Sequence, residues 1–341
     1  MATVSENKTN DLLRKLTEDH AAGRTAKPSE PANKSEPLVD TPRVTPPLSQ
    51  RFRHGPAWPI VIWIGLLHVG ALAAPFCFTW SGLTAAVFLF YLSGCIGITL
   101  GFHRLLTHSG FRTYKPVKWF LAFIGGLAGE GSALDWVSVH RKHHAHSDHE
   151  DDPHSPLDGG LWAHLIWLFP SHTSAEQMEM HNRWAPDLRK DKVLWFLHRT
   201  FILWHLLLGL SLMVGGLIAG TLSGTIYDGL YLGTSLVVWG MFLRLTVLLH
   251  VTWFVNSATH LWGYRNYETT DKSTNLWWVG LLAFGEGWHN NHHAYPRMAK
   301  HGHKWWEFDL TWNVVKLMKK TGLAWDVVDY KQKTTEGAIR D

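Results

Sequence analysis

Four long apolar runs alternate with polar segments along the chain. They cover about residues 57–80, 83–102, 201–219 and 230–254. An α-helix rises 1.5 Å per residue, and about 20 apolar residues cross the ~30 Å hydrocarbon core of a bilayer. Ser81-Gly82 is expected to form the turn between the first two runs, and the segment from Gly220 to Gly229 the turn between the last two. The pattern therefore predicts an all-α membrane protein with four transmembrane helices.

The segments outside these runs are polar. Residues 1–52 scatter Pro, Ser, Lys and Glu among few apolar residues, which predicts a disordered N-terminal tail with a short helix from Thr9 to Glu18. This tail lacks the apolar stretch of a secretory signal peptide. The predicted organisation is a tail over residues 1–52, a membrane domain over 53–325 whose helical cap comprises 103–199 and 255–325, and a C-terminal tail over 326–341.

Charged residues place the cap relative to the membrane. Arg51 and Arg53 precede the first apolar run and Arg104 follows the second, so the positive-inside rule puts these ends on the cytoplasmic side. Four crossings bring both halves of the cap to that same side. The fourth run contains Arg244 and His250. Ionisable residues within a membrane segment are expected to face the protein interior.

Composition changes the picture in two respects. With 341 residues, 46% apolar residues and a mean hydropathy of −0.08, the chain looks soluble on average. The average misleads because the apolar residues are bunched into a few long runs. The chain has 23 His and 20 Trp, which indicates metal binding and a membrane interface. The only cysteines, Cys77 and Cys95, exclude Cys₄ zinc sites and thiolate-held iron–sulfur clusters. The net charge of +4 fits lipid headgroups, and no nucleic-acid-binding motif accompanies it.

Three histidine clusters lie in the predicted cap. They are His103-Arg-Leu-Leu-Thr-His108, His140-Arg-Lys-His143-His144 and His289-Asn-Asn-His292-His293. Positions i, i+3 and i+4 share one helix face, so the second and third clusters each present three imidazoles over an arc of about 100°. His103 and His108 are five residues apart, about 140° around a regular helix. They either converge across an irregular helix end or serve different metal ions.

A fourth element follows the last apolar run. Asn256 and His260 are four residues apart and project from one helix face. His260 would be a ninth histidine ligand, and Asn256 would bind metal directly or through a water molecule. Imidazole suits iron, zinc, copper and nickel, and nine imidazoles fit two ions rather than one. Iron with open positions would activate O₂, whereas zinc would suit hydrolysis, for which the chain has no HExxH motif.

The remaining candidates have plainer interpretations. Isolated helical histidines are usually structural, which covers His68, His164, His198, His205 and His250. A further set is expected to be solvated or to support the ligands: His146, His149, His154, His301 and His303. Four acids are candidates for orienting imidazoles, namely Asp148, Asp152, Asp271 and Glu286. Trp136 and Trp253 lie close in sequence to candidate ligands, and their spacing fits either a substrate channel or core packing.

These motifs resemble those of membrane-bound fatty acid desaturases of the Δ9, stearoyl-CoA desaturase-like type. The resemblance covers roughly residues 57–320. Ser138 and Val139 stand where animal acyl-CoA members carry an Arg-Asp pair associated with CoA, as in the plant and cyanobacterial branch. The acyl carrier stays open between CoA, a glycerolipid and a carrier protein. The matching stretches are Gly101–His108, Asp135–His144, Asp151–Pro156, Asn256–His260 and Gly285–His293, the last of which reads GEGWHNNHH.

The resemblance implies an O₂-dependent desaturase that introduces a cis double bond, at Δ9, into a saturated acyl chain. It implies two iron ions as the cofactor and O₂ as a co-substrate, with no catalytic residue beyond the metal ligands. It also implies a kinked hydrophobic tunnel beside the metals, on which we place Trp136, Thr252 and Trp253. The implied ligands are His103, His108, His140, His143, His144, His260, His289, His292 and His293, with Asn256 in contact through water.

Electrons are expected from a separate protein. The chain has no haem-binding His-Pro-Gly-Gly motif and no GxGxxG fingerprint after a strand, so a cytochrome b5 or a ferredoxin with its reductase would serve. The basic residues Arg297, Lys300 and Lys304 either dock an acidic donor or face lipid. Two other functions fit the clusters. One is a histidine-box hydroxylase or oxygenase acting on lipid or alkane, and the less favoured one is a metal transporter, because the clusters lie outside the apolar runs.

Overall fold

The polypeptide folds mainly into helices. The structure, a computed structural model, describes residues 47–330, so the predicted helix at Thr9–Glu18 lies outside the described residues. Within this range the two strands are β1 (Arg112–Thr113) and β2 (Ala324–Trp325). They pair antiparallel, with Arg112 opposite Trp325. The prediction of a helical protein is confirmed for the described part of the chain.

Three helices are long and apolar enough to cross a membrane. They are Trp80–Thr107, Phe201–Ser223 and Ile226–Leu261, of 28, 23 and 36 residues. The first predicted span corresponds to a shorter apolar helix, α3 (Trp58–Ala71), of 14 residues. At 1.5 Å per residue α3 covers about 21 Å, less than the ~30 Å of a hydrocarbon core. A fourth crossing therefore stays a prediction.

Two of the spanning helices change their winding along their length. The first consists of α4 (Trp80–Phe90) followed by the π-helix η2 (Tyr91–Thr107). The second is the regular helix α11 (Phe201–Ser223). The third runs through α12 (Ile226–Val237), the π-helix η5 (Val238–Leu243) and α13 (Arg244–Leu261) without a break. The π-wound segments lie among buried residues, where they set the direction of the side chains.

The turns between the apolar runs differ from the prediction. Ser81 and Gly82 lie inside α4, and the chain turns instead through the 3₁₀-helix η1 (Ala74–Cys77). The physical reason is an N-cap: the Thr79 hydroxyl accepts a hydrogen bond from the Gly82 backbone N–H at 2.9 Å. A threonine N-cap starts a helix, and the glycine that follows it does not end that helix. The first and second runs therefore meet earlier than expected.

The glycines between α11 and α12 also have a different role. Gly220 and Gly229 both lie inside helices, and the chain turns only at Gly224 and Thr225. A Cβ atom on Gly220 would lie 2.6 Å from the Cα of Gly229, so the two backbones touch. Small residues of this kind allow close packing of membrane helices. The predicted polar turn is therefore mostly a tight helical hairpin.

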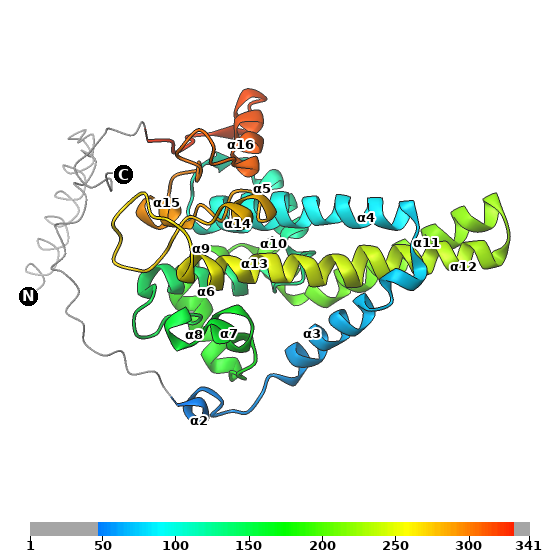
Figure 1. Ribbon diagram of the computed structural model, residues 1–341, viewed down its shortest axis with the longest axis horizontal. Helices are drawn as coiled ribbons and strands as arrows, with labels where there is room; N and C mark the ends of the chain where they lie inside the picture. Colours follow the sequence, from blue (N-terminus) through cyan, green and yellow to red (C-terminus); the bar gives the residue numbers. More distant parts are fainter. Residues whose placement is uncertain (1–46, 331–341) are drawn as a thin grey trace, which may run out of the picture. The chain divides into compact units, whose positions relative to one another are not determined.

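The cap gathers around the ends of η2 and α13, at the opposite end from the α11–α12 turn (Figure 1). Its segments come from both halves of the sequence. They are α2 (Leu48–Arg51), α5 (Lys115–Gly126), α6 (Ala133–His146), η3 (Pro156–Asp158), α7 (Gly160–His164), η4 (Ile166–Leu168), α8 (Ser174–Trp184), α9 (Pro186–Arg189), α10 (Lys192–Arg199), α14 (Trp277–Leu282), α15 (His289–Ala294) and α16 (Leu310–Lys320).

The folded domain extends beyond both predicted boundaries. Residues 48–51 form helix α2 although they belong to the predicted tail, and Arg51 pairs with Asp158 at 2.8 Å. At the other end, the Val328 backbone N–H donates to the Gly110 carbonyl at 2.8 Å. Both contacts join segments far apart in sequence, which local composition cannot indicate. The tail boundaries at residues 52 and 326 stay predictions, and residues 51 and 328 contact the folded domain.

Candidate metal centre

The first histidine cluster lies at the end of the π-helix η2. In this winding the backbone N–H of residue i+5 bonds to the carbonyl of residue i, and His108 bonds to His103 in this way at 3.2 Å. Residues five apart then share a face, and the two imidazole rings lie 4.8 Å apart. Of the two alternatives left by the sequence, the structure favours convergence of His103 and His108.

The second cluster lies on α6, whose start is fixed by a capping box. The Ser132 hydroxyl accepts from the backbone N–H of Asp135, and the Asp135 carboxylate accepts from the backbone N–H of Ser132. Such reciprocal capping determines where the helix begins and thus which face each later residue occupies. His140 and His144 point to one group of histidines, whereas the adjacent His143 points to another.

The third cluster forms the short helix α15 and depends on the glycines before it. Gly285 has φ +116°, a conformation that side chains other than glycine rarely adopt. A Cβ atom on Gly287 would lie 2.1 Å from the backbone nitrogen of Gly280. Trp288 fills the space beside them, with 2% exposure and its indole N–H on the Phe308 carbonyl. The Gly-Glu-Gly-Trp sequence thus allows the tight turn that leads into α15.

The nine predicted histidines come together in two groups. In each group the ring nitrogens that face inward lie within 4.8 Å of one another. His260, at the end of α13, joins the second group. The five-histidine group comprises His103, His108, His140, His144 and His292. The four-histidine group comprises His143, His260, His289 and His293.

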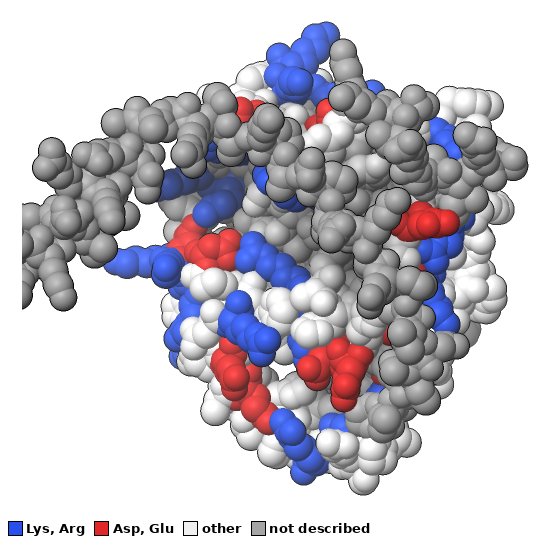
Figure 2. All heavy atoms as spheres, turned by 90° about the vertical axis from the view of Figure 1, so that its left-hand side faces the viewer, with Lys and Arg blue, Asp and Glu red and all other residues white. Residues whose placement is uncertain are grey.

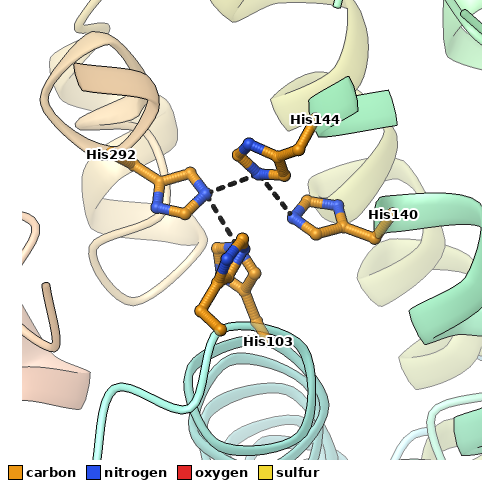
Figure 3. Close-up of side chains that lie close together, drawn as sticks. His103, His140, His144 and His292 are labelled. Carbon is orange, nitrogen blue, oxygen red and sulfur yellow. Dashed lines mark hydrogen bonds between the residues drawn. The ribbon is translucent and has the colours of Figure 1, made fainter. Parts of the chain in front are cut away.

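The nitrogens of the five-histidine group are spaced as metal ligands would be. The Nε2 atom of His292 lies 3.0 Å from that of His103 and 2.9 Å from that of His144, which lies 3.1 Å from that of His140 (Figure 3). Ligands at about 2.0–2.1 Å from one ion, separated by about 90°, lie roughly 2.9 Å apart. These rings point at one another from η2, α6 and α15, so the donor set fits one ion.

The four-histidine group has buried ring nitrogens without a protein partner among the described residues. These are the Nε2 atoms of His143, His260 and His293 and both nitrogens of His289. Buried polar atoms are nearly always paired, and an unpaired cluster of them calls for an explanation. Four converging imidazole nitrogens are a donor set for a second transition-metal ion. The residues of both groups therefore fit the pair of metal ions that the resemblance implies.

Each of the four acids predicted to orient imidazoles contacts one of these histidines, as that role requires. A carboxylate on Nδ1 keeps the proton there, so Nε2 is free to bind metal. The Nδ1–oxygen distances are 2.6 Å for His103–Glu286, 3.0 Å for His143–Asp152, 2.7 Å for His260–Asp148 and 2.6 Å for His293–Asp271.

The protonation states suit metal binding. Burial works to raise the pKa of Asp148, Asp152 and Asp271, but the neighbouring histidines outweigh it and hold each pKa below its usual value. Imidazole must be neutral to bind a metal ion, and a buried histidine beside other histidines loses its proton readily. Burial, with help from neighbouring imidazoles, lowers the pKa of His108, His140, His144, His289 and His292 well below its usual value.

A cavity adjoins both groups of histidines. His103, His140, His289 and Asn256 line its polar side. Its other walls are mostly apolar and include Ile98, Trp136, Leu248, Thr252, Val255 and Phe284. Asn256, Trp136 and Thr252 therefore lie beside the candidate metal centre, as the sequence predicts. The cavity presents apolar surface directly next to the imidazoles, which is the environment that an alkyl chain requires.

Trp253 occupies a different position. It is 2% exposed and packs in a core with Ile64 and Leu245, and it is not among the residues that line the cavity. Its ring contacts are edge-on to His164 at 5.7 Å and to His250 at 5.2 Å. Of the two interpretations that its spacing allowed, core packing agrees with the geometry. A tunnel role for Trp253 stays a prediction.

Glu130 supports two residues of the cavity wall and was not predicted from the sequence. Its carboxylate accepts hydrogen bonds from the Trp136 indole at 3.0 Å and from the Thr252 hydroxyl at 2.8 Å. Burial raises the pKa of Glu130 to about 7. It sits between Gly129 and Gly131, which have φ +78° and +95°. A glutamate between two glycines just before the second cluster is the only signal that could have drawn attention to it.

Comparison with known proteins places these features in context. The family model described as fatty acid desaturase matches residues 78–327. An sn-1 stearoyl-lipid 9-desaturase of Anabaena variabilis is 44% identical over 80% of this chain and 97% of its own length. A chloroplastic palmitoyl-monogalactosyldiacylglycerol delta-7 desaturase of Arabidopsis thaliana is 42% identical, over 76% and 66%. An acyl-CoA C20 Delta5-desaturase of Anemone leveillei is 40% identical, over 78% and 80%.

Proposed function

Because this chain belongs to the fatty acid desaturase family, it is an oxidoreductase that acts on fatty acyl chains, and we propose that it introduces a cis Δ9 double bond into a saturated acyl group esterified to a glycerolipid. The observation that carries the proposal is the pair of histidine groups beside an apolar-walled cavity. A hydroxylase would share the metal ligands, but the relatives named above are desaturases. Histidines clustered at one end of the spanning helices do not suit a transport path.

The proposed cofactor is two iron ions, one in each histidine group, with Asn256 in contact through water. When bound, such a pair supplies the O₂ activation that is needed to remove hydrogen from an unactivated methylene group. Histidine ligands agree with iron, although imidazole also suits zinc and copper. The Nδ1 contacts of Glu286, Asp152, Asp148 and Asp271 would fix the tautomer and the orientation of the four imidazoles, so that Nε2 faces the ion.

The cavity walls would act on the substrate by position. An alkyl chain has no charge or hydrogen bond to orient it, so the shape of the cavity must select which carbons lie beside the imidazoles. Trp136 and Thr252 form part of this wall and are joined through Glu130. The apolar residues Ile98, Leu248 and Val255 exclude water from the same space. A fixed wall at this point would hold the chain in the bent conformation that leads to a cis product.

The proposal of a lipid carrier rests on the relatives and on one local feature. The relatives from Anabaena variabilis and Arabidopsis thaliana are desaturases of lipid-linked acyl groups, whereas the relative from Anemone leveillei is an acyl-CoA desaturase. Ser138 is fully buried and its hydroxyl donates to the Leu134 carbonyl at 2.6 Å. It therefore offers no charged group to a CoA phosphate at the position where animal acyl-CoA members carry arginine.

Two electrons must reach the centre from another protein, and we propose that an acidic donor such as cytochrome b5 or ferredoxin docks on the cap. The third cluster is followed closely by Arg297, Lys300 and Lys304. Figure 2 views the cap end, where Lys and Arg side chains are interspersed with Asp and Glu. In this proposal the protein is a multi-pass membrane protein with four crossings, and its cap lies on the cytoplasmic side.

Expression in a host that lacks its own desaturase tests the proposal. Fatty acids released from total lipid are separated by gas chromatography, and double-bond position is assigned by mass spectrometry. We expect new Δ9 monounsaturated acids, and hydroxy acids without new olefins would contradict the desaturase assignment. Feeding defined acyl-CoA and acyl-glycerolipid to membranes separates the carriers. Product from acyl-CoA alone would contradict the lipid carrier while leaving the desaturase activity intact.

A further inference from the structure

Two buried histidines outside both groups lie beside a carboxylate that contacts a histidine inside a group. His301 Nδ1 lies 3.0 Å from Oε2 of Glu286, and the same oxygen lies 2.6 Å from Nδ1 of His103. On the other side of the centre, Nδ1 of His154 lies 4.0 Å from Oδ1 of Asp152, and that oxygen lies 3.0 Å from Nδ1 of His143. His301 is 1% exposed and His154 is 3% exposed, so neither is a solvated histidine.

His301 is held in place by its backbone. Its N–H donates to the Asp309 carboxylate at 2.7 Å, and its carbonyl accepts from the Asn291 side chain at 2.9 Å. Asp309 also binds Arg104 at 3.0 Å. Arg104 in turn occupies Oε1 of Glu286, at 3.0 Å and 3.2 Å from its Nη2 and Nε atoms. One oxygen of Glu286 is thereby bound to arginine, and the other is left to face two imidazoles.

The ring of His301 contacts two members of the five-histidine group. Its centroid lies 4.5 Å from that of His292 and 5.4 Å from that of His103. The ring of His154 contacts His143 of the four-histidine group at 4.3 Å, nearly stacked. Of the two groups, His301 therefore touches only the five-histidine group in the ring contacts of the described residues, and His154 touches only the four-histidine group. The supports of the two groups are separate.

We propose that His301 is a positioning residue for the metal ion of the five-histidine group, and that His154 has the same role for the four-histidine group. The proposal rests on the proposed function, in which both groups hold iron. Because His301 and His103 both lie within 3.0 Å of Oε2 while Arg104 binds Oε1, rotation of Glu286 away from His103 is opposed at both of its oxygens. His301 also supports the ring of His292. Its loss would change the geometry at one ion while leaving the other ion as it was.

Two conservative variants of His301 distinguish a role in positioning Glu286 from a role in filling space. In His301→Asn the amide occupies the place of Nδ1 and keeps a donor facing Glu286, whereas in His301→Gln the amide occupies the place of Nε2. We expect full-length protein in detergent to hold two irons per chain in both variants. Mössbauer spectra of isotopically enriched protein should show one of two diferrous quadrupole doublets shifted in His301→Gln and restored in His301→Asn. His154→Gln should shift the other doublet.

The outcomes separate this inference from the proposed function. Wild-type protein that holds no pair of irons would overturn the proposed function, and this inference with it. Wild-type protein with two irons, combined with unchanged doublets in His301→Gln, would overturn the inference alone. The same conclusion would follow if His301→Gln and His154→Gln shifted both doublets equally, because a general loosening of the fold would do so. Recovery in His301→Asn is the readout that a bulk packing role does not produce.

Discussion

Two regions of the molecule bury histidines in opposite ways. In the candidate metal centre, ring nitrogens converge and several of them have no protein partner within residues 47–330. Between α3, α13 and α7, three histidines instead form a hydrogen-bonded chain. Nε2 of His68 lies 3.0 Å from Nε2 of His250, and Nδ1 of His250 lies 2.9 Å from Nε2 of His164. In this second region, both nitrogens of every ring are used by another protein atom.

The two outer histidines, His68 and His164, also use the nitrogen that faces away from His250. His68 Nδ1 lies 2.7 Å from the Ile64 carbonyl, and His164 Nδ1 lies 3.1 Å from the Ser257 hydroxyl, which also reaches the Trp253 carbonyl at 2.8 Å. These contacts and the two between the rings need five protons, whereas three neutral imidazoles and one hydroxyl supply four. One contact is therefore always without a proton. These three histidines therefore leave no converging set of unbonded nitrogens for a metal ion.

A count of histidines therefore does not identify a metal site. What matters is the partner of the second ring nitrogen. Where a carboxylate holds Nδ1, as Asp148 holds that of His260 at 2.7 Å, Nε2 is directed into the group. Where both nitrogens meet carbonyls or other rings, as in His68, the histidine joins helices. Replacing residues of the candidate metal centre should therefore change metal content and enzyme activity. Replacing His68, His250 or His164 should change only the stability of the fold.

The largest effect is expected for His292→Ala, because His292 stands between two other imidazoles of the five-histidine group at 3.0 Å and 2.9 Å. We expect loss of one iron and no detectable double-bond formation, measured by elemental analysis and by gas chromatography of the host lipids. His149→Ala is the matched control, since His149 is exposed and close to the second cluster. Continued product formation by His292→Ala would remove the distinction between the two regions.

A smaller effect is expected for Asp148→Asn. Asparagine keeps the size of the side chain but removes the charge that holds the Nδ1 proton of His260. Loss of such a support typically costs about 10–100-fold in metal affinity or activity. Iron titration of the metal-free protein measures this change directly. Unchanged affinity in the variant would mean that the carboxylates around the centre do not orient its histidines.

The nine histidines that the sequence predicts as ligands are the ones that come together, but their division into two groups could not be predicted. Spacing brings His140, His143 and His144 onto one helix face, and the structure then sends His143 to a different group from its neighbours. For His103 and His108 the regular helical period suggests separation, and only the π-winding of η2 brings them together. Nothing in the local residue pattern announces that winding. Most residues of η2 are buried, so this winding lies within the packed core.

Supporting residues were harder to predict because their contacts join distant segments. Asp148 and Asp271 lie near histidine clusters in the sequence, and their roles as supports were foreseen. Glu130 acts on Thr252, which is 122 residues away. His301 lies beside Glu286, which is near it in the sequence, and its ring contacts that of His103, which is far from it in the sequence. Such partners depend on how helices pack, and a single sequence carries no record of that.

A more moderate effect is expected at Glu130, beside the centre but outside the ligands. Glu130→Gln keeps an acceptor for Trp136 and offers a donor to Thr252, so activity should stay within about threefold of the wild type. Glu130→Leu leaves two buried donors unpaired, at a cost of roughly 1–3 kcal/mol each, and should change the distribution of double-bond positions. Gas chromatography of the products from the two variants measures this difference. An unchanged distribution in Glu130→Leu would show that this wall does not position the chain.

Glu130 also predicts a dependence of stability on pH. Its pKa is raised from 4.5 to about 7 because burial disfavours the charged form. A carboxyl with a raised pKa contributes most to stability below its usual pKa, and that contribution is lost as the pH rises through about 7. Thermal unfolding in detergent should therefore show a decline over this range in the wild type that is absent in Glu130→Gln. Equal slopes would indicate that Glu130 is not buried as described.

The smallest effect on function is expected in the other region. His250→Leu removes the central ring of the chain and leaves Nε2 of both His68 and His164 without their partner. Because one contact of the chain already lacks a proton, the net loss should be about 1–3 kcal/mol of unfolding free energy. Iron content and product formation should match those of the wild type, as should those of the control Ser211→Ala on an exposed helix face. Loss of iron from His250→Leu would mean that the two regions are coupled through α13, which carries His250, Ser257 and His260.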